Sequence, residues 1–100
     1  MKIIWSPLAV ERMEEISDHI ACDSASAANR WIDSVFGKVD LLTKCPEMGR
    51  IVPELKAPSI REIIFGNYRI IYRVMDRSIR ILTVRNFKQI LPLDDLKSER

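Results

Sequence analysis

The sequence has little of the residues from which disulfide frameworks and metal centres are built. Its 100 residues include only two cysteines and one histidine. Cys22 and Cys45 fall at opposite ends of a predicted helical hairpin, which is too far apart for a disulfide bond. Two cysteines and one histidine also make a poor set of metal ligands. We therefore expect no disulfide, no metal and no other cofactor.

Long apolar runs are lacking as well. Stretches such as Ile63 to Phe65 and Ile70 to Tyr72 are far shorter than the roughly 20 residues that a membrane span requires. The first six residues hold one lysine and a short apolar run that ends before Pro7, which is unlike the apolar core of a signal peptide. These features predict a cytoplasmic protein that does not cross a membrane.

Length and composition suit a single unit. A chain of 100 residues with 47% hydrophobic residues can build one modest core, whereas two domains of half that size would each be too small to be stable. We expect one domain over residues 1–100. Residues 89–100 begin apolar and then become charged, which is typical of a partly ordered tail.

Positive charge is concentrated in one part of the chain. Residues 1–60 carry seven Lys/Arg and nine Asp/Glu, a balance of −2, whereas residues 61–88 carry seven and two, a balance of +5. Six of those seven cations are arginines, which pair well with carboxylates and phosphates. This distribution favours an acidic macromolecular partner. The alternative is that arginine simply covers the solvated face of a sheet.

The N-terminal half predicts a strand followed by two helices. Lys2 to Trp5 is a short run of β-favouring residues, and Ser6-Pro7 supplies a helix cap with proline at the first helical position. Helix-spaced apolar residues then recur twice, first at Ala9, Met13, Ile16 and Ile20 and then at Ala28, Trp31, Val35, Val39 and Leu42. In the first helix Glu11, Arg12, Glu14, Glu15 and Asp18 are expected to face water. Asp23 or Ser24 would cap the second helix and Pro46 would end it.

The C-terminal half predicts a sheet. Residues 48–59 contain one glycine and two prolines and read as an irregular loop. Three β-rich runs follow, Arg61 to Phe65, Tyr68 to Met75 and Ile79 to Phe87, with turns of two and three residues between them. Such short turns require antiparallel pairing. We therefore predict an α+β fold, in which a helical hairpin packs on one face of a three- to four-stranded antiparallel sheet that includes the N-terminal strand.

Alternation along the middle strand separates its side chains by face. Tyr68, Ile70, Tyr72 and Val74 share one face, and Arg69, Ile71, Arg73 and Met75 share the other. The tyrosine face should be the more buried one, so Arg69 and Arg73 are expected on the less buried face. The side on which Arg85 lies stays open, because a bulge near the strand end would re-aim it.

The order of these elements resembles the RelE/ParE superfamily of bacterial toxins, the toxic halves of type II toxin-antitoxin pairs. Local segments agree with the ParE branch, whose members are known as plasmid stabilisation proteins: Trp5 to Ala9, Pro46 to Arg50, Ile60 to Ile63, Tyr68 to Val74 and Ile81 to Arg85. The resemblance spans almost the whole chain. It implies a growth-arresting toxin that a cognate antitoxin neutralises by wrapping the hairpin and the sheet.

The superfamily contains two functional classes. RelE-type members are ribosome-dependent messenger RNA endoribonucleases, which need acid and base groups beside cations that support the phosphate. The stretch in which such groups are often found, Arg85 to Gln89, holds no His, Tyr, Asp or Glu, and His19 is expected on a helix surface. If the chain were a ribonuclease, the candidates would be Glu62, Arg69, Arg73 and Arg85, with Tyr68 and Tyr72 expected to serve the core instead.

The second class consists of binding proteins. ParE-type members act on DNA gyrase and trap its cleaved DNA complex without chemistry of their own, which suits this sequence better than catalysis does. The residues predicted to bind the target or the antitoxin are Arg50, Arg61, Arg69, Arg73, Arg85 and Lys88. Arg50 follows Gly49 and would contact either the helices or a partner. No small-molecule substrate is expected.

Two further readings stay open at this stage. The chain could be a non-toxic family member that retains only antitoxin binding. It could also be a nucleic-acid-binding module in which Tyr68, Tyr72 and Phe87 stack on bases, which requires both tyrosines to project into solvent.

Overall fold

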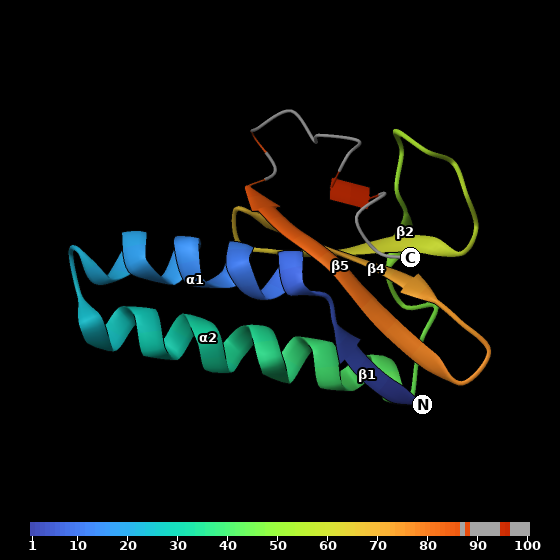
Figure 1. Ribbon diagram of the computed structural model, residues 1–100, viewed down its shortest axis with the longest axis horizontal. Helices are drawn as coiled ribbons and strands as arrows, with labels where there is room; N and C mark the ends of the chain where they lie inside the picture. The colour runs from blue at the N-terminus through green and yellow to red at the C-terminus, as the bar shows by residue number, and fades with distance from the viewer. Residues whose placement is uncertain (87, 89–94, 97–100) are drawn as a thin grey trace.

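The chain folds as a helical hairpin beside a mixed sheet, in a computed structural model that describes residues 1–86, 88, 95 and 96 (Figure 1). The elements are β1 (Lys2–Trp5), α1 (Pro7–Ala21), α2 (Ala25–Asp40), a 3₁₀ turn (Leu41–Thr43), β2 (Arg50–Ile51), β3 (Ile60–Phe65), β4 (Tyr68–Val74) and β5 (Ser78–Asn86). The predicted α+β class is confirmed. No helix among the described residues has the length and apolar character that a membrane crossing requires.

The start of α1 follows the predicted cap. Ser6 is extended, its Oγ accepts a hydrogen bond from Ala9 N at 3.0 Å, and proline comes directly after it. The same hydroxyl donates to Leu82 O at 2.9 Å, and Ser6 N donates to Ile81 O. One buried serine therefore begins the helix and ties it to β5.

The second helix ends earlier than the sequence suggests. Ser24 is its N-cap, because Ser24 Oγ accepts from Ala27 N, but the helix ends at Asp40 instead of continuing to Pro46. Thr43 Oγ1 donates to Asp40 O at 2.8 Å, which satisfies a carbonyl at the helix end while the chain tightens into the 3₁₀ turn. Leu42 is fully buried, as its apolar character predicts, but it lies in the 3₁₀ turn and not in the second helix.

In the described part of the chain, five strands form one sheet in the order β1-β5-β4-β3-β2. β1 runs parallel to β5, and the other pairs are antiparallel. The predicted meander and the N-terminal fourth strand are confirmed, with the ends of the last three strands within one residue of the prediction. The predicted antiparallel arrangement is wrong for β1, which pairs parallel to β5. The fifth strand is a correction: Arg50 and Ile51, within the segment taken as an irregular loop, pair with Glu62 and Arg61.

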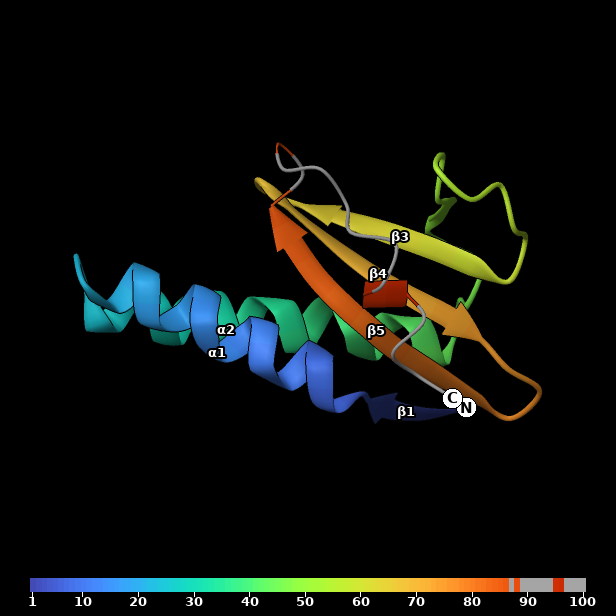
Figure 2. The same ribbon diagram turned by 45° about the horizontal axis from the view of Figure 1, so that its top comes forward.

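The sheet has a buried core on each face. On one face α1 and α2 cover a cluster that includes Ile70, Tyr72, Ile81 and Val84. On the other face Val52, Leu55 and Ala57 from the β2–β3 segment, together with Leu96, cover Ile60, Ile71 and Leu82. Figure 2 shows the helices on one side of β5 and the Asp95–Leu96 turn on the other. The face predicted to be less buried is therefore covered over its middle.

A β-bulge sets the facing of the last strand. Ile71 pairs with Thr83 and Tyr72 pairs with Ile81, so Leu82 is the extra residue on β5. Beyond the bulge, Arg85 pairs with Arg69 and lies on the same face of the sheet. The question that alternation left open for Arg85 is thereby answered.

Candidate functional site

A buried carboxylate organises the arginines at the β2 edge of the sheet. The side chain of Glu62 is fully buried; its Oε1 accepts from Arg69 Nε at 2.6 Å and its Oε2 accepts from Arg50 Nε at 2.5 Å. Arg69 also forms a bidentate pair with Glu54, at 2.7 and 2.8 Å. The hydrogen bond with Glu54 raises the pKa of Arg69, and the same bond lowers the pKa of Glu54. Two carboxylates thus neutralise two arginines.

These contacts correct the sequence interpretation of two site residues. Arg69 was expected on the less buried face as a binding residue or phosphate clamp, but only 5% of it is exposed and three of its nitrogens are bound. Glu62 was a candidate acid or base, but both of its carboxylate oxygens accept from arginine. The β2–β3 segment brings Glu54 over this face, and no periodicity in that segment could reveal the contact.

A second contact holds the loop before β2 against β4. The Tyr72 hydroxyl donates to Pro46 O at 2.8 Å and accepts from Gly49 N at 3.0 Å. A Cβ on residue 49 would lie 2.5 Å from Glu62 O and 2.6 Å from the Tyr72 hydroxyl, so only glycine fits there. Burial raises the pKa of Tyr72. The predicted core role of Tyr72 is confirmed.

Tyr68, Arg61 and Arg50 have different degrees of exposure. Tyr68 is half-buried and packs edge-on against Trp31, with ring centroids 5.2 Å apart. Arg61 Nη1 donates to Gly49 O at 2.9 Å, and its Nη2 lies 3.6 Å from the exposed Glu47. The side chain of Arg50 is 62% exposed although its Nε binds Glu62. Arg50 therefore pairs within the sheet and not with the helices.

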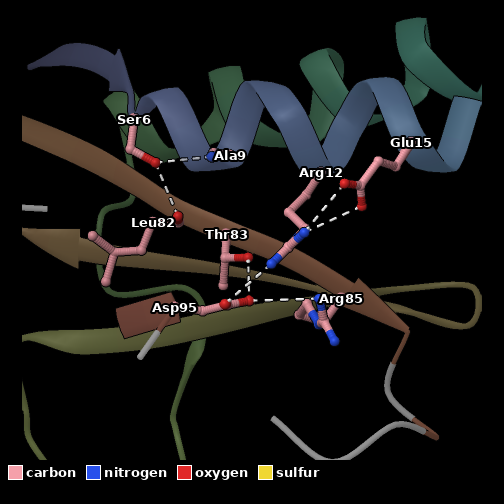
Figure 3. A network of polar contacts seen from close by, with 8 residues as sticks. All are labelled: Ser6, Ala9, Arg12, Glu15, Leu82, Thr83, Arg85 and Asp95. Carbon is pink, nitrogen blue, oxygen red and sulfur yellow. Dashed lines mark hydrogen bonds and ion pairs between the residues drawn. The ribbon is translucent and has the colours of Figure 1, made fainter. Parts of the chain in front are cut away.

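Asp95 gathers a second group of cations at the α1 edge of β5 (Figure 3). Its carboxylate accepts from Thr83 Oγ1 at 3.1 Å and from Arg12 Nη2 at 3.4 Å, and lies 3.7 Å from Arg85 Nη1. Burial lowers the pKa of Arg12, but hydrogen bonds and charge from Asp95 and Glu15 outweigh it and raise the pKa overall. The expectation that Arg12 faces water is wrong, because it reaches across β5 to this carboxylate.

A polar cleft of about 330 Å³ lies beside this group, between α1 and the end of β5. It is lined by Arg12, Glu15, Ile16, His19, Tyr68, Val84, Arg85 and Asn86. His19 is exposed on α1, as predicted, but the fold places it on the same cleft as Arg85. Sequence reasoning missed this proximity, since the two residues are far apart in the chain.

Arg73 and Lys88 complete the predicted set. Arg73 is half-buried, and its side chain forms no hydrogen bond or ion pair within the described part of the chain. Lys88 is exposed, and its backbone N donates to Asn86 Oδ1 at 2.9 Å. The predicted cations are therefore spread over the sheet in several local environments, and they do not converge on one site.

The helical hairpin carries an apolar groove of about 380 Å³ that includes an edge of the sheet. Trp5, Val10, Met13, Glu14, Ser17, Ile32 and Phe36 line it. Val10 is 43% exposed and Phe36 is 44% exposed, which is unusual for large apolar side chains that lie together. Trp5 packs edge-on against Phe36 with ring centroids 5.1 Å apart.

Known proteins resemble the chain in sequence and in fold. Residues 3–91 match the family described as ParE toxin of type II toxin-antitoxin system, parDE. The toxin-like protein Y4kP of Sinorhizobium fredii is 33% identical over 93 residues, which are 91% of this chain and 93% of that protein.

Two solved structures share the fold. One is a chain of the chromosomal ParDE toxin-antitoxin system from P. aeruginosa, with a TM-score of 0.72, 20% identity and coverage of 86% of this chain and 95% of that chain. The other is a chain of the RelBE2 toxin-antitoxin complex from Mycobacterium tuberculosis, with a TM-score of 0.58, 19% identity and coverage of 85% and 95%. The match over residues 3–91 and the similarity to Y4kP establish that this chain belongs to the ParE family of type II toxin-antitoxin toxins.

Proposed function

We propose that the protein arrests growth by binding DNA gyrase and holding its cleaved DNA complex, without chemistry of its own. The observation that carries the proposal is that Glu62, the carboxylate named as a candidate acid or base, is bound to two arginines. Its two oxygens bind Arg50 and Arg69, and its side chain has no exposed surface. Both carboxylate oxygens are therefore occupied by arginine and covered by protein, so a substrate could not reach them to transfer a proton.

The tyrosines support the same conclusion. Tyr72 is fully buried, its hydroxyl is committed to two backbone groups, and burial raises its pKa, which makes it a weaker acid than an exposed tyrosine. Tyr68 is half-buried and packs edge-on against Trp31, so its ring does not project freely into solvent as a base-stacking platform would. These contacts also count against a nucleic-acid-binding module that stacks bases on the sheet.

One observation favours a second candidate, a ribosome-dependent messenger RNA endoribonuclease. His19 lines the same cleft as Arg12, Arg85 and Asn86, so an imidazole and guanidinium groups border one space. Histidine is the side chain best suited to move protons near neutral pH, and arginine supports a phosphate. However, Glu15 and Asp95 already pair with Arg12, and Asp95 pairs with Arg85, which reduces the positive charge available there.

The proposal includes a cognate antitoxin as the neutralising partner. The related folds from P. aeruginosa and M. tuberculosis are described as parts of toxin-antitoxin systems. The apolar groove beside Val10 and Phe36 would bury the nonpolar face of such a partner, and acidic side chains would complement the exposed Arg50 and Lys88. Both the toxin and its target would then meet in the cytoplasm.

Expression in bacteria under tight control tests the target. We expect DNA-linked gyrase to accumulate after induction while messenger RNA ends stay unchanged, and His19→Gln to arrest growth as the parent does. Codon-periodic messenger cleavage that disappears in His19→Gln would establish the ribonuclease instead. Co-expression of the antitoxin should abolish the arrest in either case. An arrest that the antitoxin does not relieve would count against the toxin-antitoxin role itself, whatever the target.

A further inference from the structure

At the end of the β4–β5 hairpin, the side chains of two arginines of the basic region have no carboxylate partner among the described residues. Arg73 lies near the end of β4, and Arg77 lies in the turn. The side chain of neither arginine forms a hydrogen bond or ion pair with another described residue. By contrast, Arg50, Arg61, Arg69 and Arg85 are each bound by carboxylates or a carbonyl oxygen.

The fold places a further cation at this end. The exposed Lys2 on β1 lies opposite Ser78 on β5, and the backbone N of Lys2 donates to Arg77 O at 3.2 Å. Among the described residues that line this end, Asp76 is the only acidic one, against Arg73 and Arg77, so the local charge is positive.

Arg73, Asp76 and Arg77 border a shallow depression of about 670 Å³. Its lining is Ser59, Arg73, Val74, Met75, Asp76 and Arg77. Ser59 is exposed, and its carbonyl oxygen accepts from Val74 N at 2.8 Å, which fixes the β2–β3 segment beside β4. The depression therefore presents two guanidinium groups and a hydroxyl, on segments whose backbones are joined by a hydrogen bond.

We propose that this hairpin end binds the phosphodiester backbone of duplex DNA, with Arg73 and Arg77 on phosphate oxygens and Ser59 as an additional donor. Guanidinium groups form bidentate hydrogen bonds with phosphates, and backbone contacts of this kind carry no sequence preference. The choice of duplex DNA rests on the proposed function, because gyrase holds cleaved duplex DNA and a bound toxin could reach it. The site would then strengthen the grip of the toxin on the gyrase–DNA complex.

The test is fluorescence anisotropy of a labelled 20-base-pair duplex (on the order of two helical turns) with the purified chain alone, over a salt series. Arg73→Gln/Arg77→Gln removes the two proposed contacts. Arg30→Gln/Lys38→Gln removes the same charge from exposed positions on α2 and is the matched control. Each phosphate contact changes the slope of log K against log salt by about 0.9. We expect the hairpin variant to bind more weakly at low salt, with a slope shallower by about 2, and the control to bind as the parent does.

Folding of the hairpin variant is checked by thermal unfolding. Since the side chains of Arg73 and Arg77 form no hydrogen bond or ion pair with another described residue, removal of their charges should leave Tm nearly unchanged. Equal weakening by both double variants would overturn the site, because bulk charge would then explain the binding. Undetectable duplex binding by the parent, or displacement of the duplex by a polyglutamate peptide as readily as by unlabelled duplex, would also overturn it.

The outcome is independent of the gyrase experiment. Duplex binding that depends on Arg73 and Arg77 in a protein that does not trap gyrase would uphold the site and reject the proposed target. If the protein traps gyrase but its duplex binding does not depend on Arg73 and Arg77, the proposed target is upheld and the site is rejected.

Discussion

Glu62→Gln should destabilise the protein strongly, because it removes the negative charge between two arginines. The Glu62 side chain is fully buried and that of Arg69 is 6% exposed, so neither group can recover its interaction with water. Loss of one member of a buried ion pair costs about 3–5 kcal/mol. We expect about 3 kcal/mol, at the lower end, because Arg69 keeps Glu54 and the exposed Arg50 can turn to solvent.

That loss is large for a chain of this size. Domains of about 100 residues have unfolding free energies of roughly 5–15 kcal/mol, and each 1 kcal/mol shifts Tm by roughly 4–8 °C. Glu62→Gln should therefore lower Tm by roughly 12–24 °C. Urea unfolding at pH 7, followed by the fluorescence of Trp5 and Trp31, gives the free energy directly.

Glu47→Gln is the matched control. Glu47 also faces an arginine, at 3.6 Å from Arg61 Nη2, but its side chain is 77% exposed. An exposed pair of this kind contributes about 0–1 kcal/mol. If Glu62→Gln lowers the free energy of unfolding by no more than the control does, the buried network does not stabilise the fold, and Glu62 returns as a candidate for catalysis.

Three other changes test separate parts of the structure. Gly49→Ala places a Cβ 2.5 Å from a backbone carbonyl oxygen and should lower the free energy of urea unfolding by about 2 kcal/mol. Gly37→Ala is its control: a Cβ there meets nothing within 4 Å, so the variant should be neutral or more stable by up to about 1 kcal/mol. Equal effects of the two variants would refute the close approach at Gly49. Glu54→Gln probes pH dependence: the folded pKa of Glu54 is lowered by its hydrogen bond with Arg69, so its contribution is present above the unfolded pKa of about 4.3 and is lost as pH falls through the folded pKa. Because the Glu54 side chain is 40% exposed, the difference from the parent should be at most about 1 kcal/mol at pH 7 and should shrink in acid; a difference that stays constant down to about pH 3 would contradict this. Asp95→Ala removes a buried acceptor and should cost about 2 kcal/mol in thermal unfolding, with little relief at high salt because Asp95 is 5% exposed; a loss that 1 M salt (roughly a 3 Å screening length) abolishes would show a surface interaction instead.

Local patterns in the sequence were sufficient for most of the fold. The Ser6-Pro7 cap, the helix-spaced apolar residues and the short turns depend on neighbouring residues, so the starts of both helices and the last three strands were predicted closely. The Gly66-Asn67 turn is one example, since Gly66 has a φ of 59°, which glycine adopts readily. β2 was missed because a two-residue strand has no periodicity and exists only through its pairing with β3.

The candidate site was less predictable, because distant segments determine its exposure. Alternation placed Arg69 and Arg73 on the correct face, but it could not show that Glu54 would cover Arg69 and leave Arg73 open. Arg12 was assigned to solvent because its carboxylate partner, Asp95, lies 83 residues further along the chain. The prediction for residues 89–100 falls largely outside the described residues; of these, only Asp95 and Leu96 are described, and both are buried.

Incubation of the purified protein with purified gyrase and supercoiled plasmid, followed by denaturation and digestion of protein, most directly tests whether this toxin acts by binding. We predict linear DNA in proportion to the amount of toxin, its loss when antitoxin is added, and intact messenger RNA in a parallel translation reaction. Plasmid that stays uncleaved while ribosome-bound messenger RNA is cut would contradict the proposal and would assign the chain to the ribonuclease class.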